Sequence, residues 1–207
     1  MFALVVYQPG DEHTLRVARA VAVGLRDRAV VGLVGLPHAP TRIGTGVDLL
    51  VTGANGDWPS LTCTGDDTCA GLVGDLLDWL DHLHPMSPEL AVAAFDTSSL
   101  GAELEPAATT ICRLRRLGLR VAVPAETFLV SSLTNLLEPG EEVRARDWAS
   151  GLGTAIAGAR RRIRAARLTT GGTARSGWPR GVDTKPAAAP GSPIVSANEY
   201  MRPVRKP

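Results

Sequence analysis

The segment FALVVYQPGDEHT, residues 2–14, decides the fold class. Its first part, Phe2–Tyr7, is a short apolar run with two adjacent valines, which is typical of a buried strand. A polar loop, Gln8–His13, follows, and Thr14 is a suitable N-cap for a helix that we expect to reach about Asp27. A strand, a loop and a helix in this order form the repeating unit of a parallel α/β sheet.

The same alternation continues along the chain. Four further apolar runs predict strands, at Ala29–Leu36, Asp48–Thr52, Leu90–Phe95 and Arg120–Val130, the last interrupted at Pro124. Helical patterns separate the later runs: one is capped by Asp67, and one begins at Pro106 and ends before Gly118. A last helix is expected after the final run, from near Pro139 through Trp148, Leu152, Ile156 and Ile163. Strands and helices in alternation predict a parallel sheet covered by helices on both faces.

Composition excludes several classes of protein. With 44% hydrophobic residues, a chain of 207 residues is not disordered as a whole. No apolar run approaches the roughly 20 residues of a membrane span, and Met1–Tyr7 lacks the basic start of a signal peptide. The 3 cysteines argue against a disulfide framework. We therefore expect a cytoplasmic protein.

The charge is unevenly distributed. Residues 1–159 hold 11 basic and 19 acidic side chains, whereas residues 160–207 hold 11 basic and 2 acidic ones, so the two parts carry −8 and +9. The second part is also rich in proline and glycine, and we expect a globular domain at 1–165 and a disordered tail at 166–207. The basic segment 160–207 is a candidate contact for a polyanion, and the alternative is a solvated tail without a partner.

A ligand of a parallel α/β sheet binds beyond the carboxyl ends of the strands. Three loops occupy that edge in the predicted sheet: Gln8–His13, Gly53–Asp66 and Asp96–Leu104. A ligand-dependent function would therefore depend on residues of these loops.

The segments around these loops resemble the flavodoxin family, in particular short-chain flavodoxin-like proteins of actinobacteria. The resemblance covers about residues 2–160 and rests on Val5–Tyr7 with its loop and Thr14, Leu49–Gly53, Ala91–Thr97, Arg113–Gly118 and Val121–Val130. It implies a flavodoxin-like, doubly wound five-stranded parallel sheet of strand order 2-1-3-4-5 with helices on both faces. It also implies FMN as cofactor, electron transfer as function and a redox protein as partner.

The resemblance places the FMN phosphate at Gly10, His13 and Thr14, at the start of the first helix. This loop is degenerate, because Pro9 lacks an amide donor and carboxylates stand at Asp11 and Glu12. At about 6 Å and an effective dielectric constant near 20, each carboxylate would repel a unit negative charge by about 2–3 kcal/mol. A protonated His13 would offset part of this repulsion. Thr14 can equally be a plain helix cap.

The resemblance places the flavin ring between the next two loops. Trp58 would stack on the ring, or else cover the end of the sheet, and Asn55 and Gly56 would bond to the ring edge. Asp96 and Thr97, at the end of the fourth strand, complete the candidate site.

The remaining motifs do not indicate catalysis. Cys63 and Cys69 have a spacing that matches no common zinc or redox motif, Cys112 falls near an apolar helix face and is expected in the core, and no metal site is predicted. No hydrolase elbow or nucleotide-binding loop follows a strand. We therefore expect an electron carrier or a non-enzymatic protein. The alternative is a flavodoxin-fold domain that has lost FMN and acts as a binding or regulatory module through its acidic body and arginine-rich tail.

Overall fold

Strand β1 (Phe2–Tyr7) lies inside a parallel sheet, between β2 (Val30–Gly35) and β4 (Leu49–Asn55). The computed structural model describes residues 1–10, 12–56, 75–99 and 106–170. Strand β4 pairs with β6 (Ala91–Ser99), which pairs in turn with β7 (Arg120–Val121) and β8 (Glu126–Val130). Counted along the chain as five predicted strands, this order is 2-1-3-4-5, and the predicted topology is confirmed.

The last predicted strand is divided in two. Strand β7 pairs with the beginning of β6 at Ala91 and Val92, and β8 pairs with its end from Phe95 to Ser99. Pro124 lies in the gap, where its missing N–H cannot contribute to the ladder. The predicted interruption at Pro124 is confirmed.

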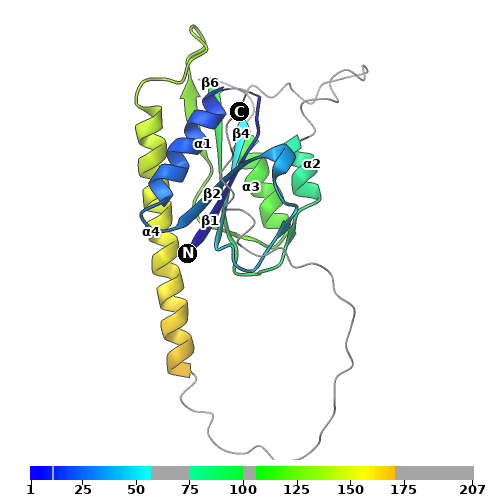
Figure 1. The fold of residues 1–207 in the computed structure, drawn as a ribbon, viewed down its shortest axis with the longest axis vertical. Coiled ribbons are helices and arrows are strands. Elements are labelled where there is room, and N and C mark those ends of the chain that lie inside the picture. The colour runs from blue at the N-terminus through cyan, green and yellow to red at the C-terminus, as the bar shows by residue number, and fades with distance from the viewer. Residues whose placement is uncertain (11, 57–74, 100–105, 171–207) are drawn as a thin grey trace, which may run out of the picture. The chain divides into compact units, whose positions relative to one another are not determined.

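Helices cover both faces of the sheet (Figure 1). Helix α1 (Glu12–Leu25) and the first part of α4 (Glu141–Thr170) pack on one face, while α2 (Asp75–Asp81) and α3 (Pro106–Arg116) pack on the other. The compact unit ends at Ala157, and α4 continues beyond it with exposed arginines. Among the described helices, none has the length and apolarity that a bilayer crossing requires.

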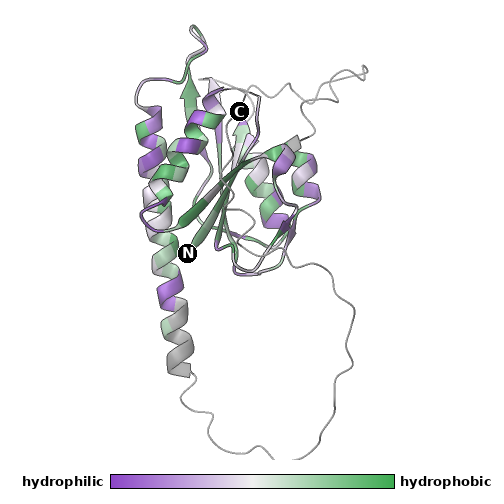
Figure 2. Ribbon diagram, in the orientation of Figure 1, coloured by the Kyte–Doolittle hydropathy of each residue, from purple (hydrophilic) through white to green (hydrophobic). Residues whose placement is uncertain are grey.

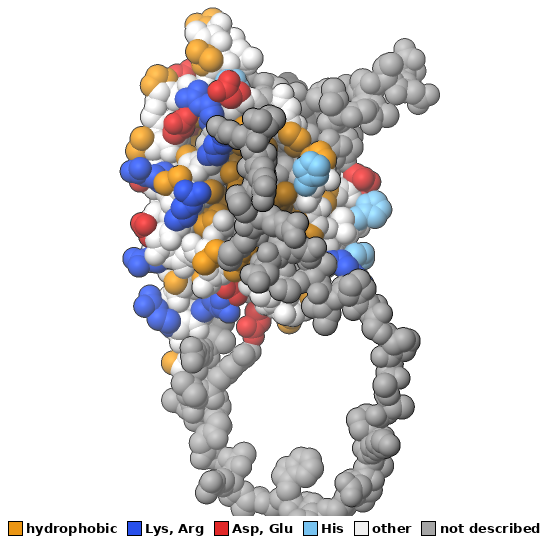
Figure 3. Space-filling view, viewed as in Figure 1, with side chains coloured by type: hydrophobic (Ala, Val, Ile, Leu, Met, Phe, Trp, Pro, Cys, Tyr) orange, Lys and Arg blue, Asp and Glu red, His pale blue; other side chains and the backbone are white. Residues whose placement is uncertain are grey.

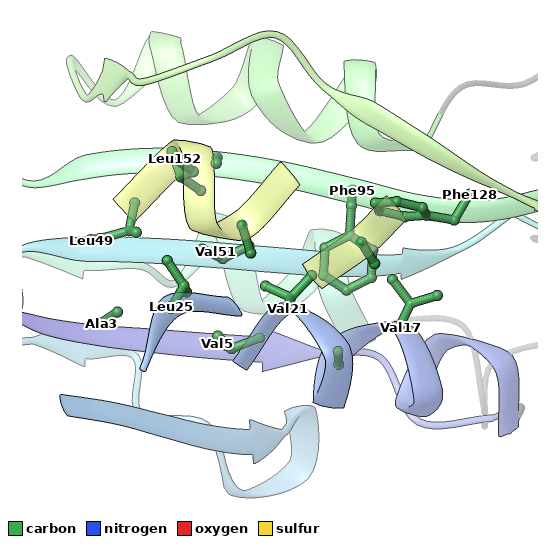
Figure 4. Close-up of a cluster of buried hydrophobic side chains, with 14 of the residues drawn as sticks. Ala3, Val5, Val17, Val21, Leu25, Leu49, Val51, Phe95, Phe128 and Leu152 are labelled. Atoms are coloured by element: carbon green, nitrogen blue, oxygen red, sulfur yellow. The ribbon is translucent and has the colours of Figure 1, made fainter. Parts of the chain in front are cut away.

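Burial follows the alternation of side chains along the strands. Val5, Val51 and Phe95 face α1 and α4, whereas their neighbours Leu4 and Leu50 face α2 and α3. Figure 4 shows α1 placing Val17 and Val21 against the rings of Phe95 and Phe128. Figure 2 shows the same distribution: the strands are hydrophobic, and the helices carry both hydrophobic and hydrophilic residues.

Two predicted boundaries are wrong. Helix α1 begins at Glu12, so Thr14 lies inside the first turn and is not the N-cap. A carboxylate in the first turn is favourable beside the positive end of the helix dipole, which explains the earlier start. Strand β6 continues to Ser99, so Asp96 and Thr97 lie in a buried strand and not in a loop.

Two further details differ from the sequence analysis. Cys112 is exposed on α3, because that helix buries Thr110, Ile111 and Leu114 on another side. A second, small sheet pairs β3 (Arg42–Ile43) with β5 (His84–Pro85), near the short helix η1 (Leu36–His38). Strands of two residues are too short to produce a periodic pattern. The helix expected from Asp67 begins, as described, at Asp75, and Asp67 lies outside the described residues.

Candidate functional site

The carboxyl ends of β1, β4 and β6 bring most of the candidate residues together. Asn55 ends β4 and is paired in register with Thr97 of β6. Gly10 and His13 follow β1, whose last residue Tyr7 is paired with Gly53. The predicted meeting of these three chain segments at one edge of the sheet is therefore found in the structure.

Thr14 and Thr97 bond to one another. Their hydroxyl oxygens lie 2.8 Å apart, and both side chains are buried. This contact joins the first turn of α1 to the end of β6. In the described structure the two hydroxyls thus serve the packing of a helix on a sheet.

Gly56 is held against β6. Its N–H donates to the carbonyl oxygen of Thr97 at 2.6 Å. A Cβ at this position would overlap that oxygen and the side chain of Ser98, so only glycine allows the approach. The Gly56 amide is thereby engaged by the backbone.

Asp96 is fully buried at the same edge. Its Oδ2 accepts a hydrogen bond of 2.9 Å from the N–H of Ala107, in the first turn of α3. A carboxylate at this place accepts a hydrogen bond from a helix N–H that would otherwise be unbonded. Its negative charge also interacts favourably with the positive end of the helix dipole. Asp96 therefore fixes the start of α3 on β6.

Two buried polar atoms, one directly after β1 and one in the first turn of α1, lack a hydrogen-bond partner within the described structure. Gln8 is 5% exposed and its N–H donates to the carbonyl of Gly53 at 2.9 Å, but its side-chain Oε1 has no partner. His13 is 8% exposed and its Nδ1 has no partner. Buried polar atoms are nearly always satisfied by protein, water or a ligand, so these two mark a place for a polar group. Gln8 belongs to no sequence motif, and its position directly after a buried strand is the signal that could have indicated it.

Gly10 lies in the loop between β1 and α1, and Glu12 begins α1. Gly10 has a φ of 151° and open space at its Cβ position, a conformation that favours glycine. Glu12 is exposed at the first position of α1. Asp11, Trp58, Cys63 and Cys69 lie outside the described residues.

The polar groups at this edge of the sheet fit the two ends of FMN unequally. At the phosphate end, the first-turn N–H groups of α1 and the His13 imidazole are suited to an anion. At the ring end, the Gly56 N–H and the Thr97 carbonyl already bond to each other, and Asn55 is the polar residue at the last position of β4. Within the described part of the chain, no group of three metal-ligating side chains occurs.

An ionic cluster holds β8 to α4 next to this edge. Arg144 bonds to Glu126, to the carbonyl of Thr127 and to Glu141, and its guanidinium lies 4.5 Å from the centre of the Phe128 ring. Burial by itself raises the pKa of Glu141, but hydrogen bonds from Arg144 and from the Leu129 N–H, together with the Arg144 charge, outweigh it, so the pKa lies below its ordinary value. The hydrogen bond from Arg144 to Glu141 raises the pKa of Arg144 in turn.

The architecture is similar to that of solved flavodoxins. Flavodoxin 1 from Bacillus cereus matches 73% of this chain and 97% of its own, with 14% identity and a TM-score of 0.55. A flavodoxin from the domain Archaea matches 75% and 99%, with 13% identity and a TM-score of 0.53. Rubredoxin oxygen:oxidoreductase from Desulfovibrio gigas matches 76% of this chain over 36% of its own length, with 12% identity and a TM-score of 0.54.

At such identities the likeness extends to the fold alone. No protein-family profile matches the sequence, and no curated protein matches it either. The chain has a flavodoxin-like fold.

Proposed function

We propose that this chain, as a protein of flavodoxin-like fold, binds FMN at the carboxyl ends of β1, β4 and β6 and carries electrons to a partner protein. The observation that carries the proposal is the pair of buried polar atoms, Gln8 Oε1 and His13 Nδ1, that have no hydrogen-bond partner among the described residues. Gln8 directly follows β1, and His13 lies in the first turn of α1. A phosphate at this place would receive hydrogen bonds from the first-turn N–H groups of α1. The likeness to solved flavodoxins supports the same edge of the sheet as the binding site.

Each residue has a separate task in this proposal. His13 and the α1 N-terminus hold the phosphate, and Gly10 permits the turn that brings the loop over it. Asn55 bonds to the ring edge and Trp58 covers the ring. Bound FMN would supply one-electron and hydride chemistry, and the protein would position the ring and exclude water from it. The protein is then a cytoplasmic electron carrier, with a redox protein as partner.

A second candidate is a flavodoxin-fold module without a cofactor. It is favoured by two internal hydrogen bonds of Thr97, one between its hydroxyl and the Thr14 hydroxyl and one from the Gly56 N–H to its carbonyl oxygen. These bonds occupy groups that the first proposal would offer to FMN. The carboxylates of Asp11 and Glu12 favour it as well. Such a module would act through its acidic body and through a polyanion contact by residues 160–207.

The experiment is a visible absorption spectrum of the purified protein, followed by titration with FMN and with riboflavin while flavin fluorescence is recorded. An absorption band of bound flavin, or quenching of FMN that saturates at one equivalent, supports the carrier. Riboflavin lacks the phosphate, so it should bind at least about tenfold more weakly, about 1.4 kcal/mol. A colourless protein that leaves both flavins fluorescent would overturn the FMN proposal and leave the module.

His13→Asn separates the proposed phosphate contact from folding. This variant should weaken FMN and leave riboflavin unchanged, because only FMN has a phosphate for the imidazole to bind. Equal losses for the two flavins would contradict a phosphate role for His13.

A further inference from the structure

A groove of about 410 Å³ runs between α1 and α4 on the outer side of the compact unit. Arg16, Arg19 and Val23 line it from α1, and Glu142, Val143 and Arg146 line it from α4. Figure 3 shows basic and hydrophobic side chains together along the side of the molecule that these helices form. The groove belongs to the two helices and not to the strand ends, so it is independent of the proposed FMN site.

Two contacts join the helices at the ends of the groove. At one end the backbones meet, because a Cβ at Gly24 would overlap the carbonyl oxygen of Arg146 and crowd Ala149. At the other end Arg16 reaches Glu142 across the groove, with Nε and Oε1 2.5 Å apart. The walls between these contacts are therefore fixed by helix packing, and the groove does not depend on a loop.

The lining combines uncompensated positive charge with exposed aliphatic surface. Glu142 neutralises Arg16, whereas Arg19 and Arg146 are exposed and have no ion-pair partner within the described residues. Val23 is 43% exposed and Val143 is 57% exposed, both large fractions for valine side chains. The net charge of the groove lining is therefore positive, whereas residues 1–159 as a whole carry −8.

We infer that this groove binds an acidic, amphipathic segment of a partner protein. Carboxylates of the segment would pair with Arg19 and Arg146, and its aliphatic side chains would cover Val23 and Val143. The chain's own segment 160–207 carries +9 and would be repelled by the two arginines, so it is not the occupant. A helix is a suitable form for the segment, because its charged and apolar side chains can lie on adjoining faces.

The test uses the full chain and a fluorescein-labelled synthetic helical peptide with leucine at every third or fourth position and glutamate between. Binding is followed by fluorescence polarisation at low and moderate salt. Wild type should bind the peptide with a Kd below about 1 mM, the affinity that corresponds to about 4 kcal/mol. The double variant R19E with R146E should weaken peptide binding at least tenfold. The double variant Val23→Ser with Val143→Ser should weaken peptide binding at the higher salt concentration as well as at the lower one.

The matched control is R115E with R116E, which changes the net charge equally at exposed arginines of α3. This control should keep the wild-type affinity within about twofold, and circular dichroism should be the same for all variants. Equal losses in the two charge-reversed proteins would assign binding to overall charge and overturn the proposal, as would absence of peptide binding to wild type. Dimerisation in sedimentation velocity that R19E with R146E abolishes would also overturn it, because a second copy would then be the occupant.

Discussion

The hydroxyl of Thr14 lies 2.8 Å from the hydroxyl of Thr97, which follows it by 83 positions in the sequence. The bond passes from the first turn of α1 to β6, over the end of β4, which lies between β1 and β6 in the sheet. Both side chains are buried, so the bond is shielded from competing water. It is a direct hydrogen bond between the helix and the strand that border the candidate site.

Replacing either threonine by valine should destabilise the protein by about 1–3 kcal/mol, because the hydrogen bond between the two buried hydroxyls is lost. The double variant should cost less than the two single losses added together, since it leaves neither hydroxyl behind. Urea unfolding of Thr14→Val, Thr97→Val and the double variant gives the coupling energy. Strict additivity would contradict a direct bond between these side chains.

Gly24→Ala and Gly151→Ala should have opposite effects on stability, although both add a methyl group to a helix. At Gly24 the methyl group meets the Arg146 backbone, and forcing it in should cost about 1–3 kcal/mol. At Gly151 the added Cβ enters open space, so the helix should gain about 0.5–1 kcal/mol. The free energy of unfolding from urea titration tests both changes. A stable Gly24→Ala protein would mean that α1 and α4 are packed less closely than described.

Glu141→Gln should destabilise the protein at neutral pH by about 1–2 kcal/mol, because the charged bonds to Arg144 are lost. The pKa of Glu141 is lowered by folding, so its stabilising effect is complete above the ordinary value of 4.5 and is lost as the pH falls through the lower, folded value. The difference between wild type and variant should therefore be constant from pH 7 to about pH 5 and shrink below it.

Glu142→Gln is the matched control for this experiment. It removes the same charge from the next residue, whose ion pair with Arg16 is largely exposed. Such surface pairs contribute about 0–1 kcal/mol, so the control should stay close to wild type. A difference for Glu141→Gln that persists unchanged at pH 3 would show that its effect is not that of the carboxylate charge.

Asp11→Thr together with Glu12→Gly should tighten FMN binding at least about tenfold, about 1.4 kcal/mol, because two negative charges leave the neighbourhood of the phosphate. Asp27→Asn with Glu89→Gln is the control, since it removes the same charge after α1 and before β6, at the opposite edge of the sheet. Fluorescence titration at low ionic strength measures both affinities. An unchanged FMN affinity in the first variant would rule out the repulsion.

Removal of residues 168–207 should weaken any binding to duplex DNA of arbitrary sequence. The deleted part holds 6 of the chain's 22 basic residues, and each phosphate that the protein neutralises contributes to the salt dependence of binding. Fluorescence polarisation at several salt concentrations should show a flatter dependence for the truncated chain. The same slope for both forms, or no binding by either, would eliminate residues 168–207 as a polyanion contact.

Local sequence patterns account for the predicted architecture. Short apolar runs such as Phe2–Tyr7 bury both faces of a strand, and alternation with helical segments leaves a parallel sheet as the suitable arrangement. Pro124 could be recognised as a break from its missing N–H alone. The presence of a candidate site at the carboxyl edge also followed, because every strand of a parallel sheet ends there.

The sequence by itself thus determined the order of strands and helices along the chain, the core on both faces of the sheet and the unequal distribution of charge. Only the tertiary structure decided that Thr14 bonds to Thr97, that Asp96 holds the start of α3 and that the Gly56 N–H is engaged by β6. Periodicity records which side of an element is buried, and it is readable within a few neighbouring residues. A hydrogen bond between distant segments depends on which strand ends become neighbours and in what register, and that is established only when the whole sheet has assembled.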